Sequence, residues 1–235
     1  MALILCAEAL TVGYDGPPIL DRVSIEIPEG MTTVVLGPNG AGKSTLAKAM
    51  VGLLRPTGGR VLLRDQDITG LGPHKLVRRG VAYLPQLMNV FGDMSVIENL
   101  EMGGYTLRRG AVGGRAKSVL ELFPDLAADH GKKARALSGG QQKMLALARV
   151  LMTDPVVAIL DEPTAGLSPL YADRVWEQID TVRAAGVALM VVEQNAVMAM
   201  EHADMVCVLG QGRNVTSGPA AELRDREEVA RILVG

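Results

Sequence analysis

A glycine-rich segment between an apolar run and a helical pattern constrains the fold of this chain more than any other feature. The apolar run is Thr32–Leu36, and the helical pattern covers Thr45–Leu54. A turn that only joins a strand to a helix needs one or two glycines and gives no reason for a lysine and a serine at the helix start. The context therefore predicts a phosphate-binding loop, the P-loop, in an α/β fold. The segment fits G-x-x-x-x-G-K-[ST] and reads Gly37-Pro38-Asn39-Gly40-Ala41-Gly42-Lys43-Ser44.

The chemistry of this loop suits the phosphates of a nucleotide. Backbone N–H groups of such a loop converge on phosphate oxygens, and the N-terminus of the following helix adds partial positive charge. Lys43 adds a full positive charge, and Ser44 is expected to ligate Mg²⁺. The loop by itself fits ATP and GTP equally. The predicted nucleotide-binding residues here are Gly37, Pro38, Asn39, Gly40, Ala41, Gly42, Lys43, Ser44 and Thr45.

Short apolar runs with the length of buried strands recur along the chain, several of them separated by helical patterns. This alternation predicts a largely parallel sheet. Further runs joined by Gly/Pro turns predict a smaller antiparallel layer. The expected parallel strands are Thr32–Leu36, Gly80–Leu84, Val156–Leu160, Val187–Val192 and Met205–Leu209, and the expected antiparallel ones are Ala2–Leu10, Val23–Ile27 and Arg60–Arg64.

We expect one domain over residues 1–235. Its antiparallel layer is expected mainly in residues 1–30 and 58–70, its helical subdomain at about 87–150, and its core in the remainder.

Capping and turn residues set the expected helix boundaries. Ser95 and Glu98 form a predicted capping box before a helix over Val96–Tyr105. The glycine-marked stretch Arg109–Arg115 is expected to be a surface loop, with the next helix over Ala116–Leu122. Later in the chain, Ser168 and Pro169 are a predicted N-cap and first-turn pair, the helix they begin carries an apolar stripe, and Gly186 ends it. The stripe consists of Val175, Ile179 and Val182.

Composition excludes several classes of protein. No apolar run approaches the ~20 residues that a membrane-spanning helix needs, and the N-terminal residues lack a positively charged flank, so we expect a cytosolic chain. The 24 basic and 26 acidic residues give a net charge of −2, which argues against a nucleic-acid partner. Two cysteines and three scattered histidines give neither a disulfide framework nor metal-ligand spacing.

Two carboxylates follow directly on the apolar run Val156–Leu160. Ligands of doubly wound sheets bind at the carboxyl ends of the strands, which is where Asp161 and Glu162 are expected to lie. Asp161 is predicted to hold Mg²⁺ through water, and Glu162 to orient or deprotonate the attacking water. The simpler alternative is a strand–loop junction with solvated acids, but the P-loop upstream favours the catalytic interpretation.

A second glycine motif, Leu137-Ser138-Gly139-Gly140-Gln141, precedes a helical run over Gln142–Met152. A capping box explains Ser138 and Gln141 but leaves the two glycines unexplained. Each glycine costs about 1 kcal/mol relative to alanine inside a helix, so their presence suggests that an anion approaches the backbone closely. This segment either contacts the nucleotide on the P-loop of the same chain or serves another copy.

In their order and spacing, the motifs Gly37–Ser44, Gln86, Leu137–Gln141 and Val156–Glu162 resemble the ATP-binding cassette of ABC transporters. The resemblance covers essentially the whole chain. It implies ATP and Mg²⁺ as ligands. It also implies a P-loop NTPase (RecA-like) core with a mostly parallel sheet, an antiparallel β subdomain and an inserted α-helical subdomain.

The resemblance also assigns roles to individual residues. It implies two cassettes that bind two ATP molecules head to tail, with Ser138, Gly139, Gly140 and Gln141 of one cassette completing the site of the other. Ser138 and Gly140 would cap the γ-phosphate held by Lys43 of the partner. Tyr14 would stack on adenine, although a half-buried strand-end tyrosine is the simpler interpretation without the resemblance. Gln86 would link the γ-phosphate and Mg²⁺ to the membrane partner, so that the implied Mg²⁺ residues are Ser44, Gln86 and Asp161.

Within that family, three stretches are most similar to the shorter ATPase subunit of branched-chain amino acid importers, with urea importers as close neighbours. They are Glu98–Tyr105, Glu162–Pro169 and Val192–Asn195. This similarity implies transmembrane permease subunits, a second ATPase subunit that is a paralogue or a second copy, and indirectly a periplasmic solute-binding protein. It also implies a peripheral position on the cytoplasmic face of a prokaryotic inner membrane.

Two positions depart from the usual cassette. Gln194 stands where most cassettes have a histidine that contacts the γ-phosphate, and Ser168 replaces the usual aspartate. The amide of Gln194 can donate a hydrogen bond but cannot take a proton as imidazole does. We hypothesise that Gln194 senses the γ-phosphate. Both departures fit the amino-acid-importer subgroup, and both bear on the intrinsic rate of hydrolysis.

The apolar residues after Gln86 have two interpretations. Leu87, Met88, Val90 and Phe91 are either part of the helical subdomain's core or a groove that receives a short helix from a transmembrane subunit.

Two other functions fit the P-loop less well. A soluble cassette ATPase acting on DNA or ribosomes would usually carry tandem cassettes or long coiled-coil insertions, and a P-loop kinase would not explain Leu137–Gln141.

Overall fold

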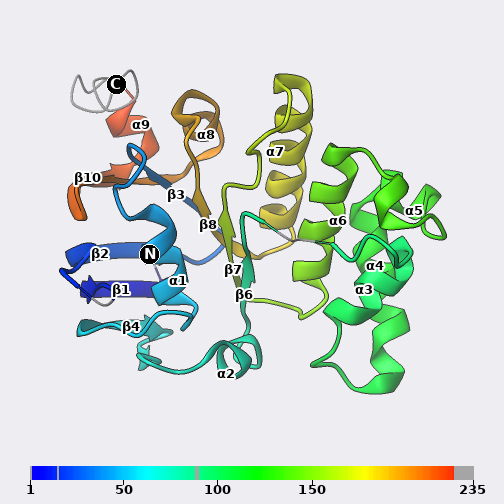
Figure 1. Cartoon of the computed structure of the whole chain (residues 1–235), viewed down its shortest axis with the longest axis horizontal. Helices are drawn as coiled ribbons and strands as arrows, with labels where there is room; N and C mark the ends of the chain where they lie inside the picture. The colour runs from blue at the N-terminus through cyan, green and yellow to red at the C-terminus, as the bar shows by residue number, and fades with distance from the viewer. Residues whose placement is uncertain (1, 15, 88–89, 225–235) are drawn as a thin grey trace.

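A six-stranded sheet forms the centre of the computed structural model, which describes residues 2–14, 16–87 and 90–224 (Figure 1). The strand order is β10-β9-β3-β8-β7-β6. All neighbours from β9 to β6 pair in parallel, and β10 pairs antiparallel with β9. The strands are β3 (Thr32–Leu36), β6 (Val81–Leu84), β7 (Val157–Asp161), β8 (Ala188–Val192), β9 (Met205–Gly210) and β10 (Arg213–Pro219).

A smaller antiparallel sheet lies beside it, with the strand order β2-β1-β4-β5. The predicted fold class is confirmed, and each expected strand is present with its ends shifted by no more than three residues. These ends are set by hydrogen bonds to neighbouring strands, which apolar runs do not encode. The strands are β1 (Leu3–Val12), β2 (Leu20–Pro28), β4 (Gly58–Leu63) and β5 (Gln66–Asp67).

Two hydrophobic cores meet at the six-stranded sheet. Along β3, Val34 and Leu36 face one core while Val35 faces the other. Strand β7 alternates in the same way, with Ala158 and Leu160 in the first core and Val157 and Ile159 in the second. Successive side chains of a strand point to opposite faces, so an unbroken apolar run is what burial on both faces requires.

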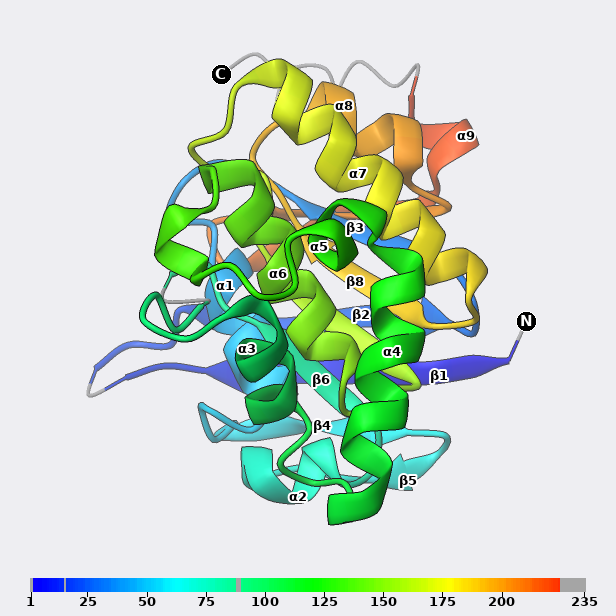
Figure 2. The same cartoon turned by 90° about the vertical axis from the view of Figure 1, so that its right-hand side faces the viewer.

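The helices divide between these two cores. Helix α1 (Lys43–Met50) packs into the core shared with the antiparallel sheet, and the helical subdomain covers the opposite core (Figure 2). The helical subdomain consists of α3 (Val96–Gly103), α4 (Val112–Leu122), α5 (Pro124–Ala128) and α6 (Gly139–Leu151), with 3₁₀ turns at Arg109–Ala111 and Ala134–Ala136. The remaining helices are α2 (Pro73–Val77), α7 (Pro169–Ala184), α8 (Ala196–His202) and α9 (Ala220–Leu223).

The prediction of a surface loop over Arg109–Arg115 is wrong. A 3₁₀ turn covers Arg109–Ala111, and α4 begins at Val112. The guanidinium of Arg115 donates to the carbonyl oxygen of Leu151 at 2.6 Å and pairs with Asp154 at 2.9 Å. These contacts, with the packing of α4 on the core, offset the cost of two glycines in its first turn.

The other expected helix boundaries are close to those observed. The capping box of Ser95 and Glu98 is confirmed, and the stripe of Val175, Ile179 and Val182 is buried in α7. Ser168 occupies the N-cap of α7, but its side chain makes no capping hydrogen bond, so Pro169 marks that helix start. Helix α7 ends at Ala184, two residues before Gly186.

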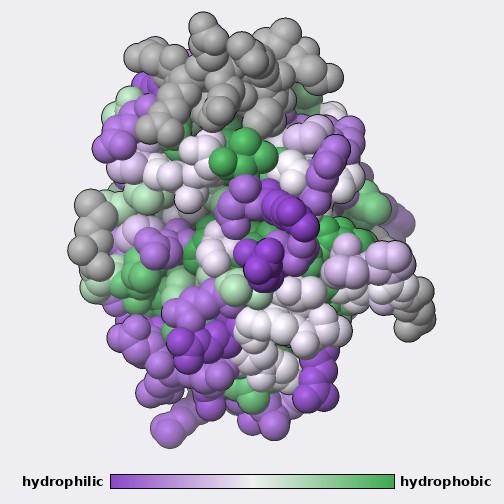
Figure 3. Space-filling model, turned by 90° about the vertical axis from the view of Figure 1, so that its left-hand side faces the viewer, coloured by the Kyte–Doolittle hydropathy of each residue, from purple (hydrophilic) through white to green (hydrophobic). Residues whose placement is uncertain are grey.

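The surface on the side of the antiparallel sheet mixes polar side chains with smaller apolar areas (Figure 3). None of the helices that the structure describes combines the length and apolar character needed to span a membrane.

The buried amide of Asn99 fixes the segment that leads into α3. Its Oδ1 accepts from the backbone N–H of Phe91 at 2.8 Å, and its Nδ2 lies 3.0 Å, 3.3 Å and 2.9 Å from the carbonyl oxygens of Phe91, Met94 and Ser95. Replacing it with leucine leaves these backbone groups without their partner in a dry site.

We expect Asn99→Leu to lower the free energy of unfolding by about 2–4 kcal/mol, measured by urea denaturation. The comparison variant is Asn195→Ala, which removes an exposed N-cap on Met198 and should cost about 1 kcal/mol. Equal losses in the two variants would contradict this account of Asn99.

Candidate functional site

In this structure the lysine of the P-loop is hydrogen-bonded to the loop itself. Lys43 is buried, and its Nζ donates to the carbonyl oxygens of Gly37 at 2.7 Å and Pro38 at 3.2 Å. Burial lowers the pKa of Lys43, while the nearby charges of Glu162, Asp161 and Glu193 oppose that shift. The ammonium group is thus held between the loop and the acidic strand end.

Gly37 is required by space as well as by backbone conformation. Its φ is +148°, and a Cβ on it would lie 2.2 Å from the carbonyl oxygen of Leu209 on β9. No larger residue fits there, so the P-loop leaves β3 in contact with the neighbouring strand.

A pocket of about 240 Å³ lies over this loop. Glu162 lines it together with the P-loop, which shows that the end of β7 and the loop share one site. Ile19, from the turn between β1 and β2, also lines it and was missed by the sequence analysis, because an isolated isoleucine carries no functional pattern. The lining residues are Ile19, Asn39, Gly40, Ala41, Gly42, Lys43, Ser44, Thr45 and Glu162.

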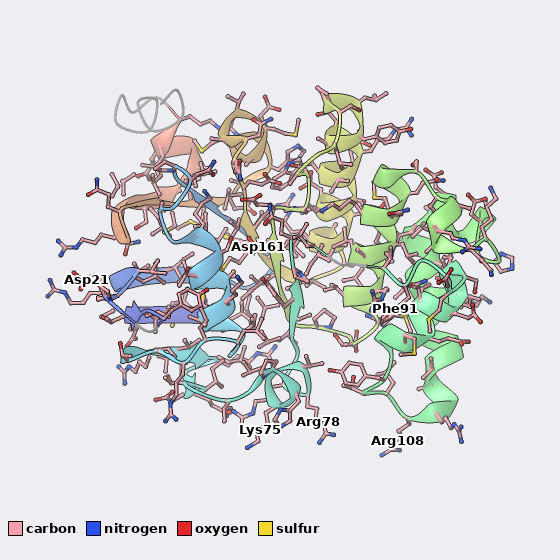
Figure 4. The ribbon with its side chains drawn as sticks, in the orientation of Figure 1. Asp21, Lys75, Arg78, Phe91, Arg108 and Asp161 are labelled. Carbon is pink, nitrogen blue, oxygen red and sulfur yellow. The ribbon has the colours of Figure 1, made fainter. Side chains whose placement is uncertain are left out.

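Asp161 joins the P-loop helix to β7 (Figure 4). Its Oδ1 accepts from Ser44 Oγ at 3.0 Å, and its Oδ2 accepts from the hydroxyl of Tyr83 at 3.2 Å. Burial raises the pKa of Asp161, and these two hydrogen bonds oppose that rise. Burial also raises the pKa of Tyr83, so the phenol remains a donor. Tyr83 was missed because its place next to β7 depends on strand order.

Glu162 accepts hydrogen bonds from two side-chain amides. Its Oε2 accepts from Gln86 Nε2 at 2.5 Å, and its Oε1 accepts from Gln194 Nε2 at 2.7 Å. Its backbone φ is +48°, which is uncommon for a residue other than glycine. The structure therefore brings together three residues that lie far apart in the sequence and fixes the direction of the Glu162 carboxylate.

A second buried carboxylate, Glu193, was not predicted. Its Oε1 accepts from Thr164 Oγ1 at 2.6 Å and from the Thr164 backbone N–H at 3.1 Å, and its Oε2 accepts from the Gln194 backbone N–H at 3.1 Å. Burial raises the pKa of Glu193, and these bonds oppose the rise. Glu193 thus ties the loop after Glu162 to the segment between β8 and α8. Its position directly after an apolar strand, like that of Asp161, was the signal available.

The second glycine motif begins α6. Ser138 and Gln141 form the predicted capping box, and the helix starts at Gly139, so both glycines lie in its first turn. A Cβ on Gly140 would lie 2.6 Å from Cδ1 of Tyr171 at the start of α7. Space beside Tyr171 therefore supplies a reason within the chain for this glycine, in addition to any ligand.

The structure does not bring this motif to the P-loop of the same chain. Helix α6 packs into the core on one face of the six-stranded sheet, and α1 packs into the core on the other face.

Tyr14 follows β1 and is 55% exposed. It does not line the pocket over the P-loop, although Ile19 of the same turn does.

Some of the apolar residues after Gln86 belong to the core of the helical subdomain, and others are exposed as a groove would require. Val90 packs against the core, whereas Leu87 is 73% exposed and Phe91 43% exposed. Met88 lies outside the described residues.

Phe91 lines a largely apolar cavity of about 610 Å³ between β6, α2 and the helical subdomain, and the guanidinium of Arg149 lies 4.5 Å from its ring centroid. The cavity is also lined by Val77, Leu84, Met102, Tyr105 and Val150.

Known proteins resemble this chain along nearly its full length. Residues 20–165 match the ABC transporter family. The chain is 40% identical over 227 residues to a probable branched-chain amino acid transport ATP-binding protein LivF of Archaeoglobus fulgidus, covering 96% of each chain. It is 34% identical over 232 residues to the high-affinity branched-chain amino acid transport ATP-binding protein BraG of Pseudomonas aeruginosa, covering 99% of this chain and 100% of BraG.

A solved ATP-binding cassette of an ABC transporter in its ADP conformation superposes with a TM-score of 0.91 at 28% identity, and the match covers all of both chains. The P-loop, the acidic strand end and the glycine motif of α6 thus occur together in a chain that matches these proteins from end to end. The chain belongs to the ABC transporter family and is an ATP-binding subunit with ATPase activity.

Proposed function

We propose that this chain powers an importer of branched-chain amino acids by hydrolysing ATP at the P-loop. The observation that carries the catalytic part is the convergence of Gln86 and Gln194 on Glu162 at the edge of the P-loop pocket. The substrate class is supported by the two relatives named above and by the similarity of Val192–Asn195 to the shorter ATPase subunit of such importers.

Lys43 and the backbone amides of the P-loop would hold the β- and γ-phosphates. Lys43 now donates to two loop carbonyls, so these hydrogen bonds would be exchanged for bonds to phosphate oxygens when ATP binds. That exchange keeps the buried ammonium group paired in both states, which limits the cost of burying its charge.

The donor set at the end of β7 fits Mg²⁺. Ser44 Oγ and Asp161 Oδ1 lie 3.0 Å apart, and both offer the hard oxygen ligands that Mg²⁺ prefers alongside phosphate and water. Ser44 and Asp161 would hold the ion, with Gln86 as a further contact. Bound Mg²⁺ would neutralise charge on the phosphate oxygens.

Glu162 would act as the general base. The amides of Gln86 and Gln194 hold its two oxygens in place, so that the carboxylate can accept a proton from the attacking water without first reorienting. Gln194 would also sense the γ-phosphate, because it lies beside this carboxylate and remains exposed.

Two ATPase subunits would complete each site. The glycine motif on α6 lies on the opposite face of the sheet from α1, so Ser138 and Gly140 would reach a nucleotide only on a second subunit, either a paralogue or another copy. Gly139 and Gln141 belong to the same helix start. Exposed Tyr14 would be free to stack on the adenine.

The cavity around Phe91 would receive a short helix from a transmembrane permease subunit. Exposed basic residues lie along the lower edge of the molecule in Figure 4, where Lys75 is on α2, Arg78 directly follows that helix and Arg108 follows α3. This charge suits an edge that faces the anionic cytoplasmic surface of the inner membrane. A periplasmic solute-binding protein would deliver the amino acid to the permease.

Glu162→Gln is expected to lower ATP turnover of the assembled complex by about 10²–10⁴-fold, because it removes the proton acceptor. ATP binding, measured by equilibrium dialysis, should remain within about twofold, since the P-loop is intact. The matched control is Glu201→Gln, an exposed glutamate on α8, which should keep full turnover. Full turnover in the Glu162 variant would remove this residue from the mechanism.

Gln194→Ala is expected to lower the kcat for ATP by roughly tenfold, because one of the two amides that orient Glu162 is lost. The control is Gln66→Ala on β5, an exposed amide with the same loss of side chain. Steady-state turnover equal to that of the unmodified complex would show that Gln194 neither orients the carboxylate nor senses the phosphate.

Phe91→Asp is expected to prevent copurification with the permease while ATP binding is retained, because a carboxylate would be desolvated in an apolar cavity. Val197→Asp, at an exposed position of α8, is the control for an added surface charge and should copurify normally. Unchanged copurification of the Phe91 variant would contradict the groove assignment.

A further inference from the structure

A second lysine lies next to the catalytic carboxylates, outside every motif described above. Lys143 is in the second turn of α6, partly buried, and its Nζ donates to the backbone carbonyl oxygen of Gln86 at 3.3 Å. Burial lowers the pKa of this lysine, and the negative charges of Glu193 and Glu162 oppose that shift. Lys143 thus lies within the field of two of the three carboxylates that act on Lys43, and it extends from α6, which packs on the opposite face of the sheet from α1.

The contacts of Lys143 continue to the catalytic base. The carbonyl group that it binds belongs to Gln86, and the side chain of Gln86 donates to Glu162. Two hydrogen bonds thus connect helix α6 to the Glu162 carboxylate, through a residue that lies in the loop after β6. The other amide on Glu162 comes from Gln194, which is tied to Glu193 instead.

Packing alone does not account for a lysine at this position. Burying an ammonium group is costly unless it is paired, and a methionine would fill a similar volume without that cost. The carbonyl of Gln86 and the nearby carboxylates offset the free-energy cost of burying the ammonium group of Lys143. A charged donor also gives a stronger bond than a neutral one.

We propose that Lys143 is a positioning residue that fixes Gln86, and through it the carboxylate of Glu162, so that helix α6 is coupled to hydrolysis at the P-loop of its own chain. This inference rests on the proposed function, because it assumes that Glu162 is the base and that Ser138 contacts the nucleotide of a second subunit. Contact of Ser138 with that nucleotide would hold α6, and with it Lys143 and Gln86, in the position that keeps Glu162 oriented.

The test measures ATP turnover and nucleotide binding in the assembled complex with three variants. Lys143→Met removes the charge and the donor at similar volume, Lys143→Arg keeps both, and Lys117→Met is the control for losing an exposed lysine elsewhere in the helical subdomain. We expect Lys143→Met to lower kcat by about 5- to 20-fold with KM for ATP within about twofold. Lys143→Arg and Lys117→Met should stay within about twofold of the unmodified complex.

A double-mutant cycle separates positioning from a general loss of structure. In a Gln86→Ala background the link to Glu162 is already broken, so adding Lys143→Met should cost less than about twofold further in kcat. Additive losses would overturn the proposal, as would unchanged turnover in Lys143→Met or equal losses in the Met and Arg variants. If the unmodified complex hydrolyses ATP and Glu162→Gln does not, such results would refute only the role of Lys143, whereas full turnover in Glu162→Gln would refute the proposed mechanism itself.

Discussion

The geometry of the site depends on the burial of three carboxylates at the carboxyl ends of β7 and β8. Each carboxylate is stabilised by hydrogen bonds from neutral donors, because burying a charge without partners would cost several kcal/mol. The donors come from the P-loop helix, from β6 and the loop after it, from the loop after β7 and from the segment before α8, so satisfying these oxygens also fixes the positions of those loops. The three carboxylates are Asp161, Glu162 and Glu193.

The double burial of the sheet explains why these loops meet at one edge. Strands β3, β7 and β8 pair in parallel, so their carboxyl ends lie side by side. Helix α1 covers one face and α6 the other, which places the P-loop and the second glycine motif on opposite sides. Contacts that pass the strand ends connect the two faces, and Lys143 with Gln86 is such a contact.

Much of the fold and part of the site could be predicted from local patterns. The P-loop, the capping box of Ser138 and the carboxylates after Leu160 are encoded within a few residues, and the structure has the P-loop and Glu162 lining one pocket. The prediction of a loop over Arg109–Arg115 is wrong because Arg115 bonds to Leu151 and Asp154, and these long-range contacts cannot be seen in a local pattern.

The sequence by itself determined the strand–loop–helix unit at Gly37–Ser44, the acidic strand end and the family, because each rests on residues that are adjacent or evenly spaced. Only the tertiary structure decided that Gln86 and Gln194 share the Glu162 carboxylate, that Tyr83 bonds Asp161, and that Lys143 reaches Gln86. Those pairs are set by strand order and by which face of the sheet each helix covers. Both follow from burying two cores at once, which is a property of the whole chain.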